Sequence, residues 1–581
     1  MFFPTTQIEL KNTGWKQLDI IIVSGDAYVD HPSFGAALIA RFLYENGFKV
    51  GIIDQPNLSD PKSLMQLGKP KLFFGITSGN MDSMINRYTA QKKIRSYDNY
   101  SPNGDISLRP DRATIAYSQA AKKAFHDVPI ILGGIEASMR RIPHYDYWQD
   151  KVRNSIIFDA RADIIVYGMG ESQTLEIGKR LKSGEDIEEI NDIKGTATTV
   201  KSPSKEGFLF KEYNKNFSKE DFYKMNLDFE NNYRSKIIYQ KFSAKYLKHN
   251  IPAIPLSQKE MDFIYNMPFE RDIHPKYKGK TIKAFEQIRT SVTSHRGCFG
   301  GCNFCAIGYH QGKTIQSRSI NSIKKELEKI TTKSYFKGTI SDVGGPTANM
   351  YEMTCKLHIS ATCTRKSCIY PTICSHLEYS HKPNIHLLKE TDKIPKIKHL
   401  FIASGVRFDL AIHDEKYMKM LTEKYTGGLL KLAPEHKSDK VLRYMAKPSF
   451  DLYEKFSDKF FHYSKNAGKK QAIVPYIIAG HPGATLNDTL ELAIYLKKNN
   501  IRLEQVQEFT PTPMSASTLM YYTGKDLENN RINIPKGRET RLQKALIQWF
   551  IPSNKKLIIE ALKKLHKIKL ISFFFDNIKR K

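Results

Sequence analysis

Residues 294–318 read SHRGCFGGCNFCAIGYHQGKTIQSR and contain the most distinctive pattern of the chain. Cys298, Cys302 and Cys305 form C-x3-C-x2-C with three glycines beside them. Glycine lets the backbone turn sharply, so we expect these three thiolates to surround one centre. Thiolates are the usual ligands of iron–sulfur clusters, and the common four-iron form takes four of them. Three cysteines would therefore leave one iron open for a cofactor or substrate.

A zinc site is the alternative interpretation of this stretch. Zinc binds mixed tetrahedra of cysteine and histidine, and His295 or His310 would complete one with the three cysteines. Zinc knuckles and ribbons more often use two C-x2-C pairs, however, and the stretch holds only one. We therefore favour the iron–sulfur interpretation.

The spacing C-x3-C-x-aromatic-C resembles the cluster loop of radical S-adenosylmethionine (SAM) enzymes, with Phe304 as the aromatic residue. The resemblance implies a [4Fe–4S] cluster held by Cys298, Cys302 and Cys305. It also implies that SAM chelates the fourth iron through its amino and carboxylate groups. Phe304 is then expected to pack over the open side of the cluster.

Composition limits the remaining possibilities. At 581 residues the chain is expected to form two to four domains, and 40% hydrophobic residues suffice for packed cores. The sequence has no long apolar run of the kind that predicts a membrane span, and its N-terminus lacks the features of a secretory signal. We therefore expect a cytoplasmic protein. The formal charge of +30 invites a nucleic-acid partner. Its lysines are scattered along the whole chain, which is typical of a compositional bias.

The first 200 residues alternate apolar strands with amphipathic helices. Five β-rich runs are expected, at 19–24, 49–54, 71–77, 129–132 and 163–167. They predict an α/β domain, a doubly wound parallel sheet over residues 1–200. The layout is similar to the cobalamin-binding-like domain that precedes many radical SAM cores. Asp30, His31 and Gly35 do not reproduce its D-x-H-x-x-G signature, so cobalamin is an unfavoured cofactor and His31 is expected to be a polar residue at a helix start.

Two polar segments of this domain, 85–113 and 136–153, carry basic and aromatic residues. Each has two interpretations, closure over a substrate or packing between domains. Residues 201–285 are rich in Lys, Asn and Tyr and show no sustained period over most of their length. We predict a connecting segment with short helices there.

Residues 286–555 form the predicted core, followed by a C-terminal helix and tail at 556–581. β-rich runs recur at about 289–295, 338–343, 398–404, 427–433, 472–479 and 503–509, and helical patterns separate most of them. Six β/α units make a partial (β/α)6 barrel, the architecture of radical SAM cores. In α/β barrels the chemistry lies at the carboxyl ends of the strands.

Candidate cofactor-binding residues follow these strands. Gly344 and Gly345 resemble the glycine pair that contacts the SAM amino group, although a proline replaces the acidic residue that usually follows. Arg407 either clamps the SAM carboxylate or forms a salt bridge with Asp409 at the barrel rim. Further polar candidates follow the fourth strand, namely Lys431, Glu435 and His436.

A second cysteine group lies in a predicted insertion, 351–380, between the second and third strands. Cys355, Cys363, Cys368 and Cys374 stand within twenty residues, which is close enough for a second cluster or a zinc ion. Their spacing fits no common template, and free buried cysteines are the alternative. The division of seven cysteines into three and four favours a metal.

The motifs SGDAYVDHPSFG, RPDRA, GGIEASMRR, GGPTANMY, ASGVR and LAPEH, together with the cluster loop, resemble the YgiQ (UPF0313) family of radical SAM proteins. The resemblance implies an enzyme that cleaves SAM reductively, with an electron donor such as flavodoxin or ferredoxin. The substrate is left open among an RNA base, a peptide and a small metabolite. Two alternatives remain: a zinc-stabilised nucleic-acid-binding protein without catalysis, and a cobalamin-assisted methyl or alkyl transferase.

Overall fold

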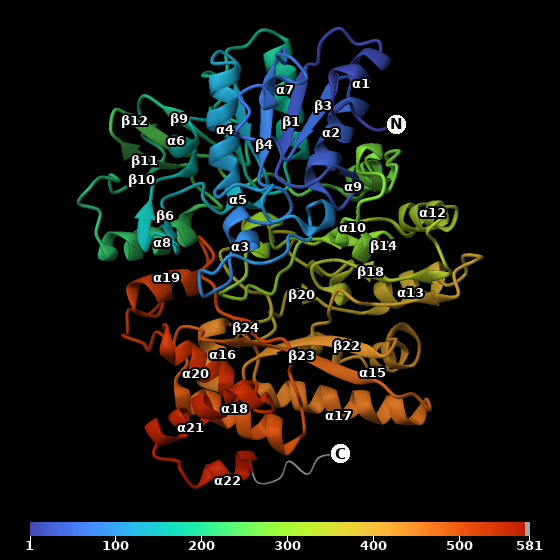
Figure 1. Ribbon diagram of the computed structural model, residues 1–581, viewed down its shortest axis with the longest axis vertical. Coiled ribbons are helices and arrows are strands. Elements are labelled where there is room, and N and C mark those ends of the chain that lie inside the picture. Colours follow the sequence, from blue (N-terminus) through green and yellow to red (C-terminus); the bar gives the residue numbers. More distant parts are fainter. Residues whose placement is uncertain (576–581) are drawn as a thin grey trace.

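The computed structural model describes residues 1–575, which form two α/β units stacked along the long axis (Figure 1). In the N-terminal unit, β1 (Ile20–Ser24) lies between β3 (Val50–Asp54) and β4 (Phe73–Thr77), and β5 (Ile130–Leu132) and β8 (Ile164–Val166) follow β4 in space. All of these neighbours are parallel. The predicted parallel sheet is confirmed.

Helices cover both faces of this sheet. Ile21 of β1 belongs to one apolar core with residues of α4 (Ala113–Ala124). Ile20 belongs to a second core with residues of α2 (Gly35–Glu45) and α7 (Glu171–Lys182). Successive side chains of a strand point to opposite faces, so a strand buried on both sides has a continuous apolar run.

The sheet continues past residue 200, where the prediction of a connecting segment was wrong. β9 (Thr196–Val200) is antiparallel to β8, and β12 (Lys245–His249), β11 (Ile238–Phe242) and β10 (Phe208–Phe210) extend the sheet to nine strands. α8 (Lys219–Asn232) lies between β10 and β11. These strands are short and partly exposed, and β12 reads KYLKH. Their weak apolar alternation explains why the sequence pattern missed them.

The second unit has strands at all six predicted positions. These are β14 (Ser291–Thr293), β17 (Thr339–Ile340) with β18 (Asp342–Gly344), β21 (His399–Leu400), β22 (Leu429–Glu435), β23 (Ala472–Ala479) and β24 (Gln507–Glu508). β14 pairs with β18, β17 with β21, β22 with β23, and β23 with β24, and each of these four pairings is parallel. The predicted radical SAM α/β core is confirmed.

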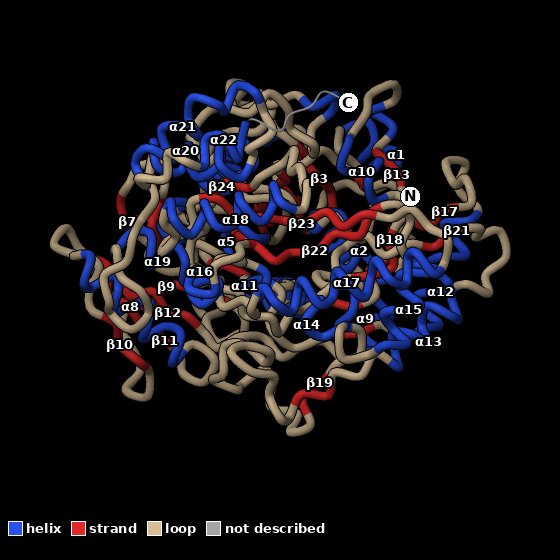
Figure 2. The backbone as a smooth tube through the Cα atoms, turned by 90° about the horizontal axis from the view of Figure 1, so that it is seen from below, coloured by secondary structure: helices blue, strands red, loops and turns tan. Residues whose placement is uncertain are grey.

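Helices follow these strands on the outside of the core. They are α12 (Ile320–Thr331), α13 (Lys382–Thr391), α15 (Glu415–Met420), α16 (Asp439–Met445), α17 (Phe450–Asn466) and α18 (Leu486–Lys498). In α12, Ile323, Leu327 and Ile330 recur at i, i+4 and i+7 and are fully buried, so one face of the helix packs on the core. Figure 2 shows β22 and β23 side by side, with α16, α17 and α18 around them.

The end of the chain forms a helical layer against the core. α20 (Arg538–Ile547), α21 (Lys555–Lys564) and α22 (Leu570–Phe575) share an apolar core with α18. α21 and α22 lie within the predicted C-terminal helix and tail, and residues 576–581 fall outside the described part of the chain. Between residues 1 and 575, no helix has the length and apolar character needed to cross a membrane.

Candidate functional site

The loop with the first three cysteines is closed at its base by a short antiparallel pair, β15 (His295–Arg296) with β16 (Gln316–Ser317). Gly297 has a φ of +89°, and a Cβ there would lie 2.1 Å from the carbonyl oxygen of Thr314. Gly301 has a φ of +63°, and its Cβ would lie 2.7 Å from the Cβ of Ser367. Both positions therefore require glycine, for conformation and for space.

The three thiols converge inside this loop. The position that a Cβ of Gly300 would occupy lies 3.3 Å from the sulfur of Cys298 and 3.9 Å from that of Cys302. The backbone N–H of Cys305 donates to the carbonyl of Cys302 at 3.2 Å. Burial, and then the proximity of Cys302, raises the pKa of the Cys298 thiol and raises that of Cys305 to about 12. Iron must therefore displace protons from these buried thiols when it binds.

The zinc alternative depends on a histidine beside the three cysteines. Within residues 1–575, no three or more His, Cys, Asp or Glu side chains lie close enough together to hold one metal ion. Cysteines that bind different irons of one cluster stand further apart than the ligands of one zinc. His295 is also unsuited to zinc, because its Nε2 donates to the carbonyl of Thr347 at 3.0 Å and its Nδ1 accepts from Ser294 at 2.9 Å. His310, the other candidate ligand, has its Nδ1 3.1 Å from the hydroxyl oxygen of Ser138, so the structure gives no specific support to the zinc interpretation.

Of the two roles considered for Arg407, the structure shows the salt bridge with Asp409, and a contact with the SAM carboxylate stays a prediction. Its Nε and Nη2 bind the carboxylate of Asp409 at 2.8 and 2.6 Å, while Nη1 lies 3.6 Å from the sulfur of Cys302. Burial would raise the pKa of Asp409, but Arg407 holds it below its usual value. The pair is 8% and 5% exposed, so it places a fixed cation beside the cysteine sulfurs with its counter-charge behind it.

Gly344 and Gly345 end β18 at the mouth of the core. A Cβ on Gly344 would lie 2.1 Å from the hydroxyl oxygen of Ser404, and one on Gly345 would lie 2.7 Å from the carbonyl oxygen of His295. Close packing alone therefore excludes side chains at both positions. Their contact with SAM stays a prediction.

Phe304 lies against the end of the fifth core strand. Its ring centroid is 6.2 Å from that of His481, which follows β23 and whose Nε2 lies 2.7 Å from the hydroxyl of Ser517. Burial lowers the pKa of His481 to about 3, so its ring is neutral. His481 was not among the predicted site residues, and its place in the G-H-P-G turn after a strand was the available signal.

The polar candidates in and just after β22 separate from one another. Glu435 is buried, has a left-handed φ of +68°, and lies 3.9 Å from the ammonium group of Lys447. Its charge contributes to the raised pKa of Cys305, which places it near the cysteines. Lys431 is exposed, and the Nδ1 of buried His436 accepts from the backbone of Ser438 at 3.0 Å. Of these candidates, Glu435 is the one that lies near the cysteine site.

The second cysteine group packs against the first. The N–H of Cys368 donates to the carbonyl of Phe299 at 3.1 Å, and the hydroxyl of Ser367 donates to the carbonyl of Gly300 at 2.8 Å. Cys298, Cys368 and Cys374 border one small apolar cluster. The insertion, which also carries Cys355 and Cys363, therefore braces the cluster loop. A second metal or cluster at these four cysteines stays a prediction.

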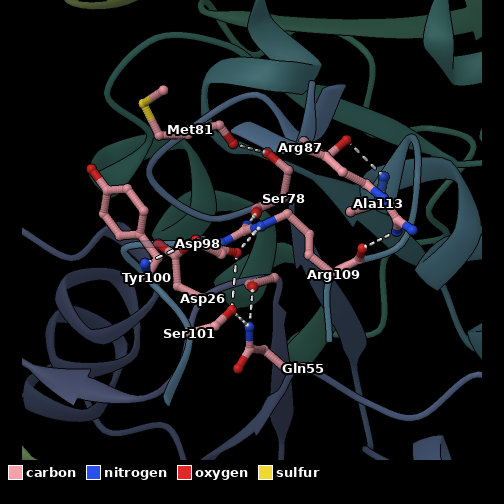
Figure 3. A network of polar contacts seen from close by, with 12 residues as sticks. Asp26, Gln55, Ser78, Met81, Arg87, Asp98, Tyr100, Ser101, Arg109 and Ala113 are labelled. Atoms are coloured by element: carbon pink, nitrogen blue, oxygen red, sulfur yellow. Dashed lines mark hydrogen bonds and ion pairs between the residues drawn. The ribbon is translucent and has the colours of Figure 1, made fainter. Parts of the chain in front are cut away.

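The basic residues of the N-terminal loops serve internal packing. Arg109 is fully buried and binds Asp26 at 2.8 Å and Asp98 at 3.0 Å, as well as the carbonyl of Ser78 (Figure 3). This network ties the long loop at 85–113 to the carboxyl ends of the sheet. His31 is 1% exposed and its Nδ1 accepts from the N–H of Ser33 at 3.1 Å, just before α2, as predicted.

A cavity of about 510 Å³ joins the two units. On the sheet side it is lined by residues at the ends of parallel strands, among them Gly133 after β5 and Gly168 after β8. On the core side it is lined by Val292 of β14, by Arg296 and by Gly344. It therefore opens directly beside the glycine pair at the mouth of the core.

Comparison with known proteins covers nearly the whole chain. The family described as Radical SAM N-terminal matches residues 2–291, the Radical SAM superfamily matches residues 292–496, and a domain of unknown function, DUF3362, matches residues 504–575. Among solved structures, the radical S-adenosylmethionine methyltransferase TsrM from Kitasatospora setae is similar, with a TM-score of 0.49 and 12% identity over 86% of this chain and 75% of that one.

Curated relatives are much closer in sequence. A UPF0313 protein of Methanocella arvoryzae is 46% identical over 98% of this chain and 96% of its own length, and one of Methanosarcina acetivorans is 45% identical over 98% and 81%. The UPF0313 protein YgiQ of Escherichia coli is 43% identical over 98% and 87%. Identity at this level and over this length shows that the chain belongs to the UPF0313 (YgiQ) family of radical SAM proteins.

Proposed function

We propose that the protein is a radical SAM enzyme that cleaves SAM reductively at a [4Fe–4S] cluster held by Cys298, Cys302 and Cys305. The observation that carries the proposal is the convergence of three partly buried thiols in a glycine-shaped loop beside the guanidinium of Arg407. When bound, the cluster would supply the electron that splits SAM into methionine and a 5′-deoxyadenosyl radical, which then abstracts a hydrogen atom from the substrate.

The protein's own residues prepare the site for this chemistry. Arg407 holds a positive charge next to the sulfurs, which favours the thiolate form and the addition of negative charge. The backbone of Gly344 and Gly345 would contact SAM, with the carbonyl of Gly345 as the acceptor, because that of Gly344 already accepts from the N–H and the hydroxyl of Ser294. Phe304 and the neutral ring of His481 form an apolar wall that excludes water from the open side.

The reaction partners are proposed at a coarser level. The substrate is an RNA base, a peptide or a small metabolite, and the electron donor is a small redox protein such as flavodoxin or ferredoxin. We place the protein in the cytoplasm, where free thiols persist. Neither alternative function gains a specific observation, since His295 is committed to other contacts and His31 is buried at a helix start.

The test is SAM cleavage by the full chain purified without oxygen. With dithionite and SAM, wild type is expected to release 5′-deoxyadenosine, and Cys302→Ala is expected to release none and to lose cluster iron. Cys374→Ser is the matched control, because it removes a thiol of the bracing insertion; it is expected to keep both cluster iron and SAM cleavage. A wild-type preparation with an intact cluster that never forms 5′-deoxyadenosine would refute the proposal.

A further inference from the structure

A smaller pocket, of about 110 Å³, lies beside the cluster loop. Its walls come from residues 308–314 of that loop, from residues 252–256, and from the start of α7 and the end of α8. Arg141, Arg234 and Lys313 belong to this lining, whereas none of the described residues that line it is Asp or Glu. We call this space the basic pocket, because its lining is positively charged.

Two cations in and beside the basic pocket have nitrogens that a ligand can reach. Arg234 of the lining and Lys366 of the insertion are half-buried, and the nitrogens of both keep accessible surface. Within residues 1–575 these nitrogens form no hydrogen bond and no ion pair. Burial lowers the pKa of Lys366, Glu230 raises it and Arg234 lowers it, so the two cations lie close together. Both are therefore available to bind an anion.

Two further cations are held in the wall. Lys313 is 9% exposed and donates to the carbonyls of Cys363 and Arg365, both at 2.7 Å, which leaves one of its three N–H groups for a ligand. Arg141 is 1% exposed, and its Nε donates to Nε2 of His249 at 2.9 Å. Among the described residues, no carboxylate pairs with either cation. Arg141 is covered, so it acts on the pocket through its charge and not through contact.

The charges around the basic pocket are not balanced. Glu230 is the carboxylate nearby, where it accepts from the hydroxyl of Tyr309, and its charge acts on Arg141 and Lys366. Four cations therefore face a single carboxylate. Like charges that are packed together in a half-buried site repel one another, and a bound anion relieves this repulsion. A doubly charged anion relieves it more than a singly charged one.

The start of α7 adds a second, independent feature that favours an anion. Ser172 and Gln173 of its first turn line the basic pocket. The N-cap residue is Gly170, which has no side chain to cap the free N–H groups of this turn. The unpaired N–H groups and the dipole of a helix N-terminus are a common binding site for phosphate.

The size of the basic pocket limits what it can hold. Whole small-molecule ligands occupy about 300–1,000 Å³, so a space of about 110 Å³ accommodates an end group only. The cavity of about 510 Å³ between the two units is large enough for the rest of a small molecule. The two spaces are neighbours, because they share the lining residues Gly168, Met169, His310 and Gln311.

The larger cavity offers an anion no free cation. Asn80 is neutral, and burial lowers the pKa of His310 to about 4, so its ring is neutral as well. Asp342 is an acid, and Arg296 is covered and bound to Glu171 at 2.6 Å. An anionic end group is therefore directed to the basic pocket, and the body of the ligand to the larger and mainly apolar cavity.

We propose that the basic pocket binds the phosphate monoester group of a small substrate whose body lies in the larger cavity. The inference rests on the proposed function, because it names the substrate class of that enzyme. A phosphate monoester carries a charge of about −1.5 to −2 at pH 7 and has three strong acceptor oxygens, which suits several cations at once. Each phosphodiester of an RNA strand carries a single charge.

The probe is phenyl phosphate, compared with methyl phenyl phosphate, a singly charged diester, and with phenyl sulfate, which has the same shape and one charge. Binding to the full chain, purified without oxygen, is measured by isothermal titration calorimetry in a buffer free of phosphate and sulfate. We expect saturable binding of phenyl phosphate, at least about tenfold tighter than that of the other two. Equal binding of all three, tighter binding of the diester, or no binding would overturn the proposal.

Two arginines give a matched pair of variants. Arg234 stacks on Tyr233 with its guanidinium carbon 4.4 Å from the ring centroid, and Arg289 stacks on Tyr335 at 5.4 Å. Both are half-buried, and neither forms an ion pair with the described residues, but Arg289 lines neither cavity. Arg234→Met is expected to weaken phenyl phosphate binding at least about tenfold, while Arg289→Met retains it.

Lys366→Met is expected to weaken binding as well, because its ammonium group is the other reachable cation. Circular dichroism checks that each variant is folded. Wild-type affinity in both Arg234→Met and Lys366→Met would overturn the proposed location.

The same preparations are assayed for SAM cleavage, which separates the two proposals. Phenyl phosphate binding without 5′-deoxyadenosine formation would refute the proposed function and leave the basic pocket assigned as a phosphate site. SAM cleavage without phenyl phosphate binding would refute the present inference alone. If phenyl phosphate did not bind and Arg234→Met slowed cleavage driven by flavodoxin but not by dithionite, the pocket would be a docking site for the electron donor, and the inference would be wrong.

Discussion

Replacing Arg407 with Met tests the link between the buried ion pair and the cluster site. Arg407 holds Asp409 through two hydrogen bonds and points its third nitrogen at Cys302. The substitution turns a neutral pair into a lone carboxylate that is only 5% exposed. It therefore removes a cation from the sulfurs and leaves an anion behind.

Two magnitudes follow from this geometry. Breaking a buried ion pair by removing one partner lowers the free energy of unfolding by about 3–5 kcal/mol. At an effective dielectric constant of about 20, a unit charge at the 3.6 Å separating Nη1 from the sulfur is worth about 4–5 kcal/mol. An electron shared over a four-iron cluster places about a quarter of its charge at one sulfur, so the effect is about 1 kcal/mol, or a midpoint potential lower by about 50 mV.

Guanidinium unfolding followed by circular dichroism measures the first effect, and a redox titration followed by electron paramagnetic resonance measures the second. Arg407→Met with Asp409→Asn is the matched control, because it removes the stranded carboxylate and should recover more than half of the lost stability, whereas its midpoint potential should stay below that of wild type because the cation is still missing. A single variant as stable as wild type, with an unchanged midpoint potential, would refute this account of the pair. A double variant worse than the single one would refute it as well.

Three further predictions concern other parts of the chain. Gly301→Ala should push the bracing insertion off the cluster loop and lower cluster iron at least twofold by iron analysis, whereas Gly308→Ala, whose Cβ meets nothing within 4 Å, should retain it. Arg109→Met should lower the free energy of unfolding by about 3–5 kcal/mol, because it leaves two buried carboxylates without their cation. Lys69→Met is the control: it removes an exposed ion pair and should change the free energy of unfolding by about 1 kcal/mol or less. Burial lowers the pKa of His381 to about 4 from 6.5, so the folded protein requires the neutral ring. The free energy of unfolding should therefore fall as the pH drops from 6.5 toward 4, by about 2 kcal/mol at pH 5. This loss should be absent in His381→Gln. Equal pH dependence of wild type and His381→Gln in chemical denaturation would contradict the last prediction.

Local patterns predicted most of the architecture. The buried strands of the N-terminal sheet are continuous apolar runs, and each core strand ends in a glycine-rich or polar motif, so their positions follow from composition and period. β10, β11 and β12 were missed because they are short and partly exposed, and polar residues interrupt the apolar pattern of β11 (IYQKF) and β12 (KYLKH). The cysteine spacing likewise predicted the cluster loop without any tertiary information.

Contacts between distant segments decided the rest. Arg407 and Asp409 are close in sequence, so the sequence offered their pairing as one of two alternatives, but it did not indicate that the remaining nitrogen of Arg407 would face Cys302. Glu171 and Arg296 are 125 positions apart, and no pattern in either segment indicated that they meet. Spacing determines which residues can reach one centre, because a short loop limits where its side chains can go. Which side chains complete that centre depends on how the sheet and the core pack together, because this packing decides which charged groups from distant segments are buried beside one another.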